Sequence, residues 1–308
     1  MNIEHSLWTE RYRPKTLSEY VFSNPQQKLQ IEAFVKNKDL PNLLLHGSPG
    51  TGKSSAAAML INELHIDPYD VLWINASRER NIDTMRDRIT TFASTMPFGT
   101  MKVVVLDESD GLTPVAQAAL RGILEQYASS SRFILTCNYP NRIIPAIHSR
   151  TQSLEICKMD VTDFTSKLAE ILLTENIDFD LDTLDDYVRG TWPDLRKGIN
   201  SCQLNSVDGK LLKQNESTSS SDYKIDAIAL FKAGKIREAR KLICEQIRPE
   251  ELESFFRFCY DILDLWGNTN ELTDQAILII RKAMVQIPVC ADAEILCSAV
   301  LIELSQLT

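Results

Sequence analysis

Short apolar runs alternate with stretches of helical periodicity between residues 42 and 156. The five runs are rich in β-branched and aliphatic residues: Asn42 to His46, Val71 to Asn75, Lys102 to Asp107, Arg132 to Cys137 and Gln152 to Ile156. The intervening stretches are long enough for crossover helices, so the alternation predicts a parallel sheet with helices on both faces. Ligands bind at the carboxyl edge of such sheets, and we expect the chemistry where these strands end.

Helical patterns without strands follow, and they predict two further domains. Residues 159–205 predict a small helical domain, with Asp160 and Asp180 as N-caps and Pro193 starting another helix. Residues 206–222 include a polar run that predicts a flexible linker. Residues 223–308 predict an all-helical domain, in which one helix face carries Leu272, Ala276, Ile279, Ile280, Ala283 and Ile287. The sheet domain is therefore expected to span residues 1–158.

Composition limits the class of protein. The 308 residues are 44% hydrophobic and 24% charged, which is typical of a compact globular protein. A formal net charge of −9 argues against a chain that coats nucleic acid, so any DNA contact is expected to be local. We find no apolar stretch suited to a signal peptide or a membrane span. The seven scattered cysteines include no C-x-x-C pair, which favours free thiols in a reducing cytoplasm over disulfides or zinc ligands.

The residues from Gly47 to Ser54, Gly-Ser-Pro-Gly-Thr-Gly-Lys-Ser, match the phosphate-binding pattern G-x-x-x-x-G-K-[ST]. An apolar run precedes the motif and a helical run follows it, as the motif requires. Backbone N–H groups of such a loop surround phosphate oxygens, Lys53 neutralises the outer phosphates, and the Ser54 hydroxyl is placed for Mg²⁺. The motif predicts ATP binding by Gly47, Ser48, Pro49, Gly50, Thr51, Gly52, Lys53, Ser54 and the adjacent Ser55.

Polar side chains also end two other predicted strands. Asp107 and Glu108 follow the apolar residues Val103 to Leu106. Next to a phosphate-binding loop, Asp107 is suited to hold Mg²⁺ and Glu108 to activate the attacking water. Asn138 follows the next strand, where its amide is suited to contact the γ-phosphate or that water. Without the loop, either feature is as typical of an ordinary solvated turn.

Five other segments carry a more specific pattern: Trp8-Thr-Glu-Arg-Tyr-Arg-Pro14, Asn75-Ala-Ser-Arg-Glu-Arg-Asn-Ile-Asp83, Ala116-Gln-Ala-Ala-Leu-Arg121, Ser149-Arg-Thr151 and Pro193-Asp-Leu-Arg196. In this order they resemble the AAA+ ATPase subunits of sliding-clamp loaders, both replication factor C small subunits and the ATPase subunit of T-even-like phage clamp loaders. The C-terminal helices resemble their oligomerisation collar less specifically. The four-cysteine zinc module of bacterial relatives is absent. The resemblance leaves a cellular or viral source open; a viral protein of this kind would act in the host cytoplasm.

The resemblance implies roles for the residues that match the family's motifs. It places Lys53, Ser54, Asp107 and Glu108 on the nucleotide and magnesium positions, Asn138 on sensor 1, and Arg196 on the sensor 2 arginine of the lid. Arg150 falls on the arginine finger, which reaches the ATP of the adjacent subunit. The resemblance also places Arg11, Tyr12, Arg13 and Pro14 on a segment that packs near the adenine.

The chain departs from the family pattern at two positions that bear on function. Thr151 replaces the usual cysteine after Arg150, which leaves the arginine itself intact. Gly122 stands where many relatives carry a second basic residue, which weakens a DNA role at that position. A DNA contact is expected instead from Arg80 and Arg86. The acidic residues nearby, Glu79, Asp83 and Asp87, make a self-neutralised helix face an equal alternative.

With this resemblance, the chain is expected to fold as an α/β P-loop AAA+ ATPase domain with a parallel sheet, a helical lid and an all-α collar. The expected function is ATP hydrolysis that drives opening of a ring-shaped sliding clamp and its loading onto primer-template DNA. Expected partners are copies of the chain, at least one other clamp-loader subunit through the collar, the clamp and the DNA, with no membrane. The alternatives are another AAA+ replication ATPase, such as a helicase or helicase loader, and a non-hydrolysing scaffold subunit. The intact Lys53, Asp107 and Glu108 argue against a scaffold.

Overall fold

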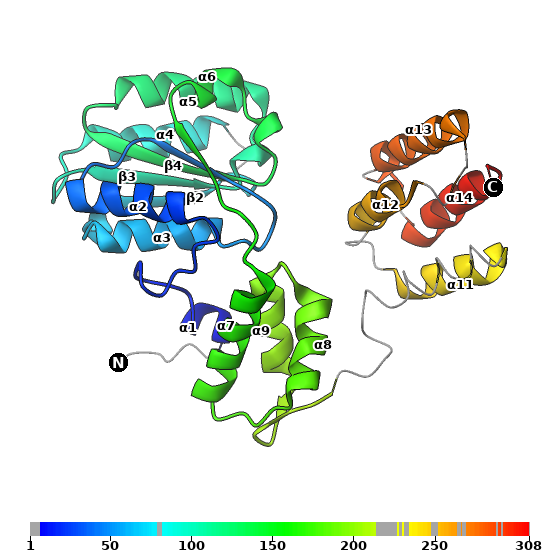
Figure 1. The fold of residues 1–308 in the computed structure, drawn as a ribbon. Coiled ribbons are helices and arrows are strands. Elements are labelled where there is room, and N and C mark those ends of the chain that lie inside the picture. Colours follow the sequence, from blue (N-terminus) through cyan, green and yellow to red (C-terminus); the bar gives the residue numbers. More distant parts are fainter. Residues whose placement is uncertain are drawn as a thin grey trace. The chain divides into compact units, whose positions relative to one another are not determined.

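The chain divides into two compact units, Met1–Lys213 and Gln214–Thr308 (Figure 1). The computed structural model describes residues 7–78, 82–213, 227, 230, 234–247, 252–263, 266, 269–287, 289–290 and 292–307. The first unit holds a five-stranded sheet and a small helical domain, and the described part of the second unit is helical. None of the described helices is both long and apolar enough to cross a membrane.

A parallel five-stranded sheet forms the centre of the first unit. Its strands are β1 (Leu43–His46), β2 (Val71–Asn75), β3 (Lys102–Asp107), β4 (Ser131–Cys137) and β5 (Gln152–Glu155). They lie in the order β2-β3-β4-β1-β5, and every neighbouring pair is parallel. The predicted strands are confirmed, with bounds that differ by one residue or none. This order brings the carboxyl ends of β3, β4 and β1 side by side, where the candidate residues follow each strand.

Helices cover both faces of this sheet (Figure 1). On one face lie α2 (Pro25–Asn37) and α3 (Lys53–Glu63), and on the other lie α4 (Ile82–Ser94), α5 (Pro114–Gln126) and α6 (Pro145–His148). Because side chains alternate along a strand, β3 feeds both cores: Val103 and Val105 join the α2–α3 core, whereas Val104 and Leu106 join the α4–α5–α6 core. All four are fully buried, which explains why these strands show apolar runs instead of an alternating pattern.

The helical lid contains α7 (Val161–Thr174), α8 (Leu181–Thr191) and α9 (Leu195–Leu204). Asp160 and Asp180 cap α7 and α8 through their side chains, as predicted. The prediction that a helix starts at Pro193 is wrong by two residues. Asp194 is the N-cap, because its carboxylate accepts the backbone N–H of Lys197 at 3.1 Å, and α9 begins after it.

A short N-terminal helix, α1 (Trp8–Arg11), belongs structurally to the lid although it precedes the sheet in sequence (Figure 1). Trp8 is buried in the lid core among Phe164, Leu168 and Tyr187. Its backbone N–H donates to Oε1 of Gln203 on α9 at 3.0 Å. The segment that follows Trp8 is therefore fixed to the lid at one end and leads to the sheet domain at the other.

Residues 206–213 do not form part of a linker, contrary to the prediction. The strands β6 (Ser206–Val207) and β7 (Lys210–Leu211) make an antiparallel hairpin that completes the lid. Asp208 and Gly209 form its turn with positive φ values of 50° and 75°, the conformation that Asp-Gly turns favour. Leu211 is buried in the lid core. Residues 214–222 of the predicted linker lie outside the described residues.

The second unit contains α11 (Ile236–Gln246), α12 (Leu252–Asp261), α13 (Asn270–Gln286) and α14 (Ala293–Ser305). The predicted apolar face of α13 packs into its core. Ala276, Ile280 and Ala283 are almost fully buried there, and Ile279 and Ile287 pack at the margin. Trp266 is also buried in this core and donates its indole N–H to the carbonyl oxygen of Cys259 at 2.9 Å.

Candidate nucleotide-binding site

A cavity of about 340 Å³ lies at the carboxyl edge of the sheet, between the phosphate-binding loop and the lid. Fourteen of the residues predicted to bind or act on nucleotide line it: Tyr12, Arg13, Pro14, Pro49, Gly50, Thr51, Gly52, Lys53, Ser54, Ser55, Asp107, Glu108, Asn138 and Arg196. Arg11, Gly47, Ser48, Arg86 and Arg150 do not line it. Arg80 lies outside the described residues. The structure thus brings residues from five separate segments of the sequence to one site.

Lys53 is buried at the base of this cavity, with 8% of its surface exposed. Its Nζ donates to the carbonyl oxygens of Gly47 at 3.0 Å and of Ser48 at 2.7 Å. Burial lowers the pKa of Lys53, and the nearby Arg196 guanidinium lowers it further, against the opposing effect of Asp107 and other anionic groups. A desolvated ammonium and a nearby guanidinium therefore line the same cavity, which favours binding of an anion such as phosphate.

Ser54 and Asp107 are in direct contact at the start of α3. The Ser54 hydroxyl donates to Asp107 Oδ1 at 2.8 Å and lies 3.0 Å from Oδ2. The hydroxyl of Thr136 on β4 also donates to Asp107 Oδ1, and it accepts the backbone N–H of Glu108 at 3.1 Å. A hydroxyl and a carboxylate on adjoining elements supply the hard oxygen ligands that Mg²⁺ prefers. This pair therefore fits the metal position predicted for it.

Glu108 follows Asp107 in a left-handed backbone conformation, with φ of 57°. Non-glycine residues in this region carry strain of about 1–3 kcal/mol, and such residues are concentrated at functional sites. The Glu108 carboxylate accepts a hydrogen bond from the hydroxyl of Ser77, just after β2, whereas Asp107 contacts Ser54. The two adjacent acidic residues thus have separate partners, which suits them to different roles.

Asn138 lies in a loop that a third acidic residue fixes. Asp110 Oδ2 accepts the backbone N–H groups of both Asn138 and Tyr139, each at 3.0 Å. Asp110 is in the short helix η2 (Ser109–Gly111), directly after the acidic pair. The loops that follow β3 and β4 are therefore held together at the cavity, and the position of Asn138 depends on Asp110.

The lid meets the phosphate-binding loop at Gly50. This glycine has a φ of 77°, and a Cβ built on it would lie 2.3 Å from Cγ of Asp194, the N-cap of α9. Only glycine fits both the backbone conformation and this close approach. Arg196 follows in the first turn of α9 and is exposed to the cavity. No ion pair between Arg196 and a carboxylate exists within the described part of the chain, so its charge is available to an incoming anion.

The segment from Arg11 to Pro14 links the lid to the sheet domain. The Tyr12 hydroxyl and the Arg11 guanidinium both contact Glu175 Oε1 at the end of α7, at 2.7 Å and 2.5 Å. Burial, followed by the hydrogen bond with Glu175, raises the pKa of Tyr12 to about 12. Arg13 donates to the Ser54 carbonyl oxygen at 3.3 Å. Tyr12, Arg13 and Pro14 line the cavity, whereas Arg11 is turned toward the lid.

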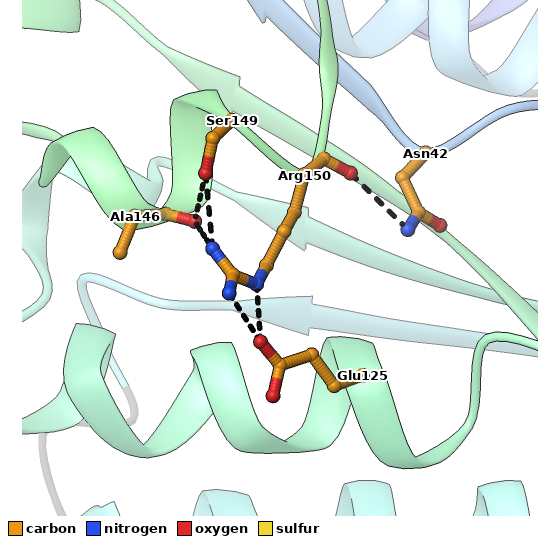
Figure 2. A network of polar contacts seen from close by, with 5 residues as sticks. All are labelled: Asn42, Glu125, Ala146, Ser149 and Arg150. Atoms are coloured by element: carbon orange, nitrogen blue, oxygen red, sulfur yellow. Dashed lines mark hydrogen bonds and ion pairs between the residues drawn. The ribbon is translucent and has the colours of Figure 1, made fainter.

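Arg150 lies on the far side of the sheet domain from this cavity. It precedes β5, and its carbonyl oxygen accepts a hydrogen bond from the side chain of Asn42, which precedes β1 (Figure 2). Because all strands are parallel, the edge where they begin is opposite the edge that carries the phosphate-binding loop. Arg150 is therefore remote from the nucleotide site of its own chain.

Several residues of the site were not predicted. Thr136 and Asp110 adjoin predicted residues and bear oxygen atoms at the same sheet edge, so the rule that ligands bind at strand ends would have found them. Ser77 and Glu175 act through contacts with residues far away in sequence. Ser77 is part of a segment that carries the family pattern, but that pattern does not indicate its contact with Glu108. Nothing in the local sequence of Glu175 distinguishes it from an ordinary surface residue. Asp194 is recognisable as an N-cap, but its contact with Gly50 follows only from the fold.

Comparisons with known proteins identify the family. The model of the ATPase family associated with various cellular activities (AAA) matches residues 43–159. The Replication factor C small subunit of Methanococcus maripaludis is 35% identical over 279 residues, which are 89% of this chain and 84% of that protein. The chain belongs to the replication factor C small-subunit family. The fold class and the resemblance predicted from the motifs are thereby confirmed.

Other relatives in the replication factor C small-subunit family match a shorter part of the chain. The Replication factor C small subunits of Sulfurisphaera tokodaii and Saccharolobus solfataricus are each 41% identical over 68% of this chain. These matches cover 64% of each relative, which is less than two thirds of its length. Among solved structures, the RuvB Holliday junction branch migration motor of Thermotoga maritima shares the fold, with a TM-score of 0.57 over 71% of this chain and 79% of that one, at 15% identity.

Proposed function

We propose that the cavity binds ATP with Mg²⁺ and hydrolyses the γ-phosphate, and that this activity drives the loading of a sliding clamp onto DNA. The contact between Ser54 and Asp107 beside the buried Lys53 carries the first part of the proposal. Lys53 and Arg196 neutralise the outer phosphates, and Ser54 and Asp107 hold the metal. Bound Mg²⁺ would neutralise charge that develops on the phosphate oxygens during transfer.

We assign separate roles to the remaining polar residues of the cavity. Glu108 is the general base that orients and deprotonates the attacking water, because its carboxylate is not engaged by Ser54. Asn138 contacts the γ-phosphate or that water, on a loop that Asp110 fixes. Gly47 to Ser55 surround the phosphates, and Tyr12, Arg13 and Pro14 border the adenine side. These tasks need only residues of the first unit of the same chain, and the arginine finger is supplied by the first unit of an adjacent subunit.

The clamp-loading role rests on family membership, because the relatives are Replication factor C small subunits. We propose that the chain assembles with copies of itself and with at least one other subunit through residues 223–308. In this view ATP stabilises the assembly that holds a ring-shaped clamp and primer-template DNA, and hydrolysis releases both. A helicase or helicase loader is the nearer alternative. Stimulation of the ATPase by the cognate clamp distinguishes them, since only a loader should respond to a clamp.

DNA contacts are proposed for α4, whose start follows Arg80. Arg86 on this helix is exposed, as a residue that contacts phosphate must be. With a net charge of −9, one chain should bind DNA weakly, and several copies would add their contacts together. DNA affinity should therefore require the assembled protein and decrease with salt concentration.

An exposed apolar surface lies at the edge of the sheet opposite the cavity and is a candidate contact for the clamp. Tyr69, Met96 and Phe98 are 77%, 89% and 79% exposed, and the two rings are 5.7 Å apart between centroids. Tyr69 is in the short helix η1 (Pro68–Asp70) before β2, and Met96 and Phe98 precede β3. The buried Asp70 holds this surface together by accepting the backbone N–H groups of Phe98 and Gly99 at 2.9 Å and 2.7 Å. Exposed aromatic groups on a fixed backbone are typical of protein contacts.

We expect the double substitution Tyr69→Ala and Phe98→Ala to remove clamp stimulation of the ATPase while basal turnover and ATP affinity stay unchanged. Aromatic anchors of an interface cost about 2 kcal/mol or more when truncated. The measurement is ATPase rate against clamp concentration with primed DNA. Leu29→Ala, which truncates an exposed apolar residue of α2, is the control. Full clamp stimulation of the double variant would exclude this surface as the clamp contact.

Arg150 is proposed to act on the nucleotide of an adjacent subunit. Its place at the edge opposite the cavity of its own chain supports this role, because it leaves the guanidinium available to a neighbour. Such an arginine offsets charge on the transferring phosphoryl group and increases the rate by about 10³-fold or more.

We expect trans complementation between two inactive variants. An Arg150→Ala chain keeps its nucleotide site but lacks the finger, whereas a Lys53→Ala chain keeps the finger but lacks a working site. Mixed assemblies should recover ATPase activity in proportion to the interfaces that pair the two variants. Each variant assembled alone is the control. If mixed interfaces form but no activity returns, Arg150 does not act in trans.

A further inference from the structure

The guanidinium of Arg150 is held in place within its own chain (Figure 2). Nε donates to Glu125 Oε1 at 2.6 Å, and Nη2 forms an ion pair with the same oxygen. On the other side, Nη1 donates to the Ala146 carbonyl oxygen at 2.7 Å and to Ser149 Oγ at 2.9 Å. Glu125 is in the last turn of α5, and Ala146 and Ser149 are in and just after α6. Two helices therefore fix the plane of the guanidinium.

The backbone of Arg150 is fixed as well. Its N–H donates to the Ile147 carbonyl oxygen at 2.9 Å, and its carbonyl oxygen accepts from Asn42 Nδ2 at 3.4 Å. Asn42 is itself fixed, because its Oδ1 accepts the backbone N–H of Phe133 at 3.0 Å. Both ends of the long arginine side chain thus have defined positions relative to the sheet.

These contacts leave one donor for a ligand. A guanidinium has five N–H groups, and four of them are used by the contacts with Glu125, Ala146 and Ser149. The fifth, on Nη2, has no partner among the described residues. The side chain is also 32% exposed. A phosphate oxygen from outside the chain can therefore approach this group without displacing the carboxylate.

We propose that Glu125 is a positioning residue that presets the guanidinium of Arg150 for the nucleotide of the adjacent subunit. The inference rests on the proposed trans role of Arg150. An arginine side chain loses much rotamer freedom when it is ordered, and Glu125 orders it before assembly instead of during the reaction. The interface then gains an oriented donor whose position is accurate enough for catalysis.

A role in fold stability does not account for this pair. The Glu125 side chain is 53% exposed, and ion pairs between exposed groups contribute little to stability because water and salt screen them. Glu125 variants are therefore expected to fold and assemble normally. Their effect should appear in turnover, at the interfaces where the altered chain supplies the finger.

The contact geometry distinguishes positioning from simple charge compensation. Both Arg150 nitrogens that meet Glu125 share one oxygen, Oε1. A glutamine at this position keeps an oxygen of the same reach, so Glu125→Gln should retain most of the turnover. Alanine offers no acceptor, so Glu125→Ala should release the guanidinium. If Glu125 instead withheld Arg150 from the nucleotide, Glu125→Ala would increase turnover.

The test places Glu125→Ala in either chain of the complementing mixture, in the full assembly with its partner subunits. In the Lys53→Ala chain, which donates the finger, we expect kcat to decrease by about tenfold or more with KM unchanged, since small misplacements of catalytic groups can cost up to about 10²-fold. In the Arg150→Ala chain, where Glu125 has no guanidinium to hold, the same change should have no effect. Gln126→Ala, at the adjacent exposed position of α5, is the control.

The possible outcomes distinguish a failure of the positioning role of Glu125 from a failure of the trans role of Arg150. An active mixture in which Glu125→Ala lowers kcat only in the finger donor, with rescue by Glu125→Gln, supports the inference. An active mixture with no effect, with equal effects in both chains, or with increased turnover overturns the inference alone. A mixture that assembles but is inactive before Glu125 is changed overturns the trans role of Arg150, and the inference with it.

Discussion

The Lys53→Ala variant is expected to lose productive ATP binding. Lys53 is 8% exposed, and its Nζ is held 2.7 Å and 3.0 Å from two carbonyl oxygens of the phosphate-binding loop. Those carbonyl groups keep the ammonium at the site where phosphates are expected. When ATP binds, the ammonium exchanges the neutral carbonyl oxygens for charged phosphate oxygens. Removing one partner of a buried charge pair costs about 3–5 kcal/mol, which corresponds to binding that is weaker by a factor between about 10² and about 4 × 10³.

Isothermal titration with ATP and a non-hydrolysable analogue measures this loss. Lys167→Ala is a matched control, because Lys167 also lines the cavity but forms an ion pair with Glu170 at 2.8 Å. Its replacement should change affinity by a few-fold at most, because the charge of Lys167 is already paired with that of Glu170. Wild-type affinity in Lys53→Ala would show that the phosphates bind elsewhere.

The features predicted correctly from the sequence are those that depend on local chemistry. A strand with both faces buried appears in the sequence as a continuous apolar run, such as Val103 to Leu106. The spacing of the glycines before Lys53 is fixed by the phosphate-binding loop itself. Caps such as Asp160 and Asp180 act within three residues of their own position. Each of these signals is contained in a short window, so the parallel sheet and most of the cavity lining could be predicted.

The features that were missed depend on contacts between distant segments. The hydrogen bond from Ser77 to Glu108 spans 31 residues, and the bond from Arg150 to Glu125 spans 25. Motifs single out Glu108 and Arg150 themselves, but no pattern in the sequence links either residue to its partner. The hairpin at 206–213 was overlooked for a different reason. Its turn, Asp208-Gly209, is a dipeptide typical of hairpins. The polar run that follows it in the sequence favours a linker, and the prediction followed that run.

The Glu108→Gln variant is expected to bind ATP normally and to lose turnover. Glutamine keeps the size of the side chain, and the contacts of Lys53, Ser54 and Asp107 do not involve it, so nucleotide and metal binding should persist. What is lost is the basic carboxylate, and general acid–base catalysis contributes about 10²–10⁴-fold to rate. We therefore expect a long-lived ATP-bound protein whose single-turnover rate is lower by that factor.

Quenched-flow measurement of phosphate release, alongside ATP affinity, tests the assignment. Glu19→Gln is the control, because Glu19 also lines the cavity but uses its carboxylate to accept the backbone N–H of Lys15 at 2.7 Å. That variant should keep its turnover within a few-fold. Unchanged turnover in Glu108→Gln would assign the base to another residue, whereas loss of ATP affinity would show that Glu108 contributes to binding.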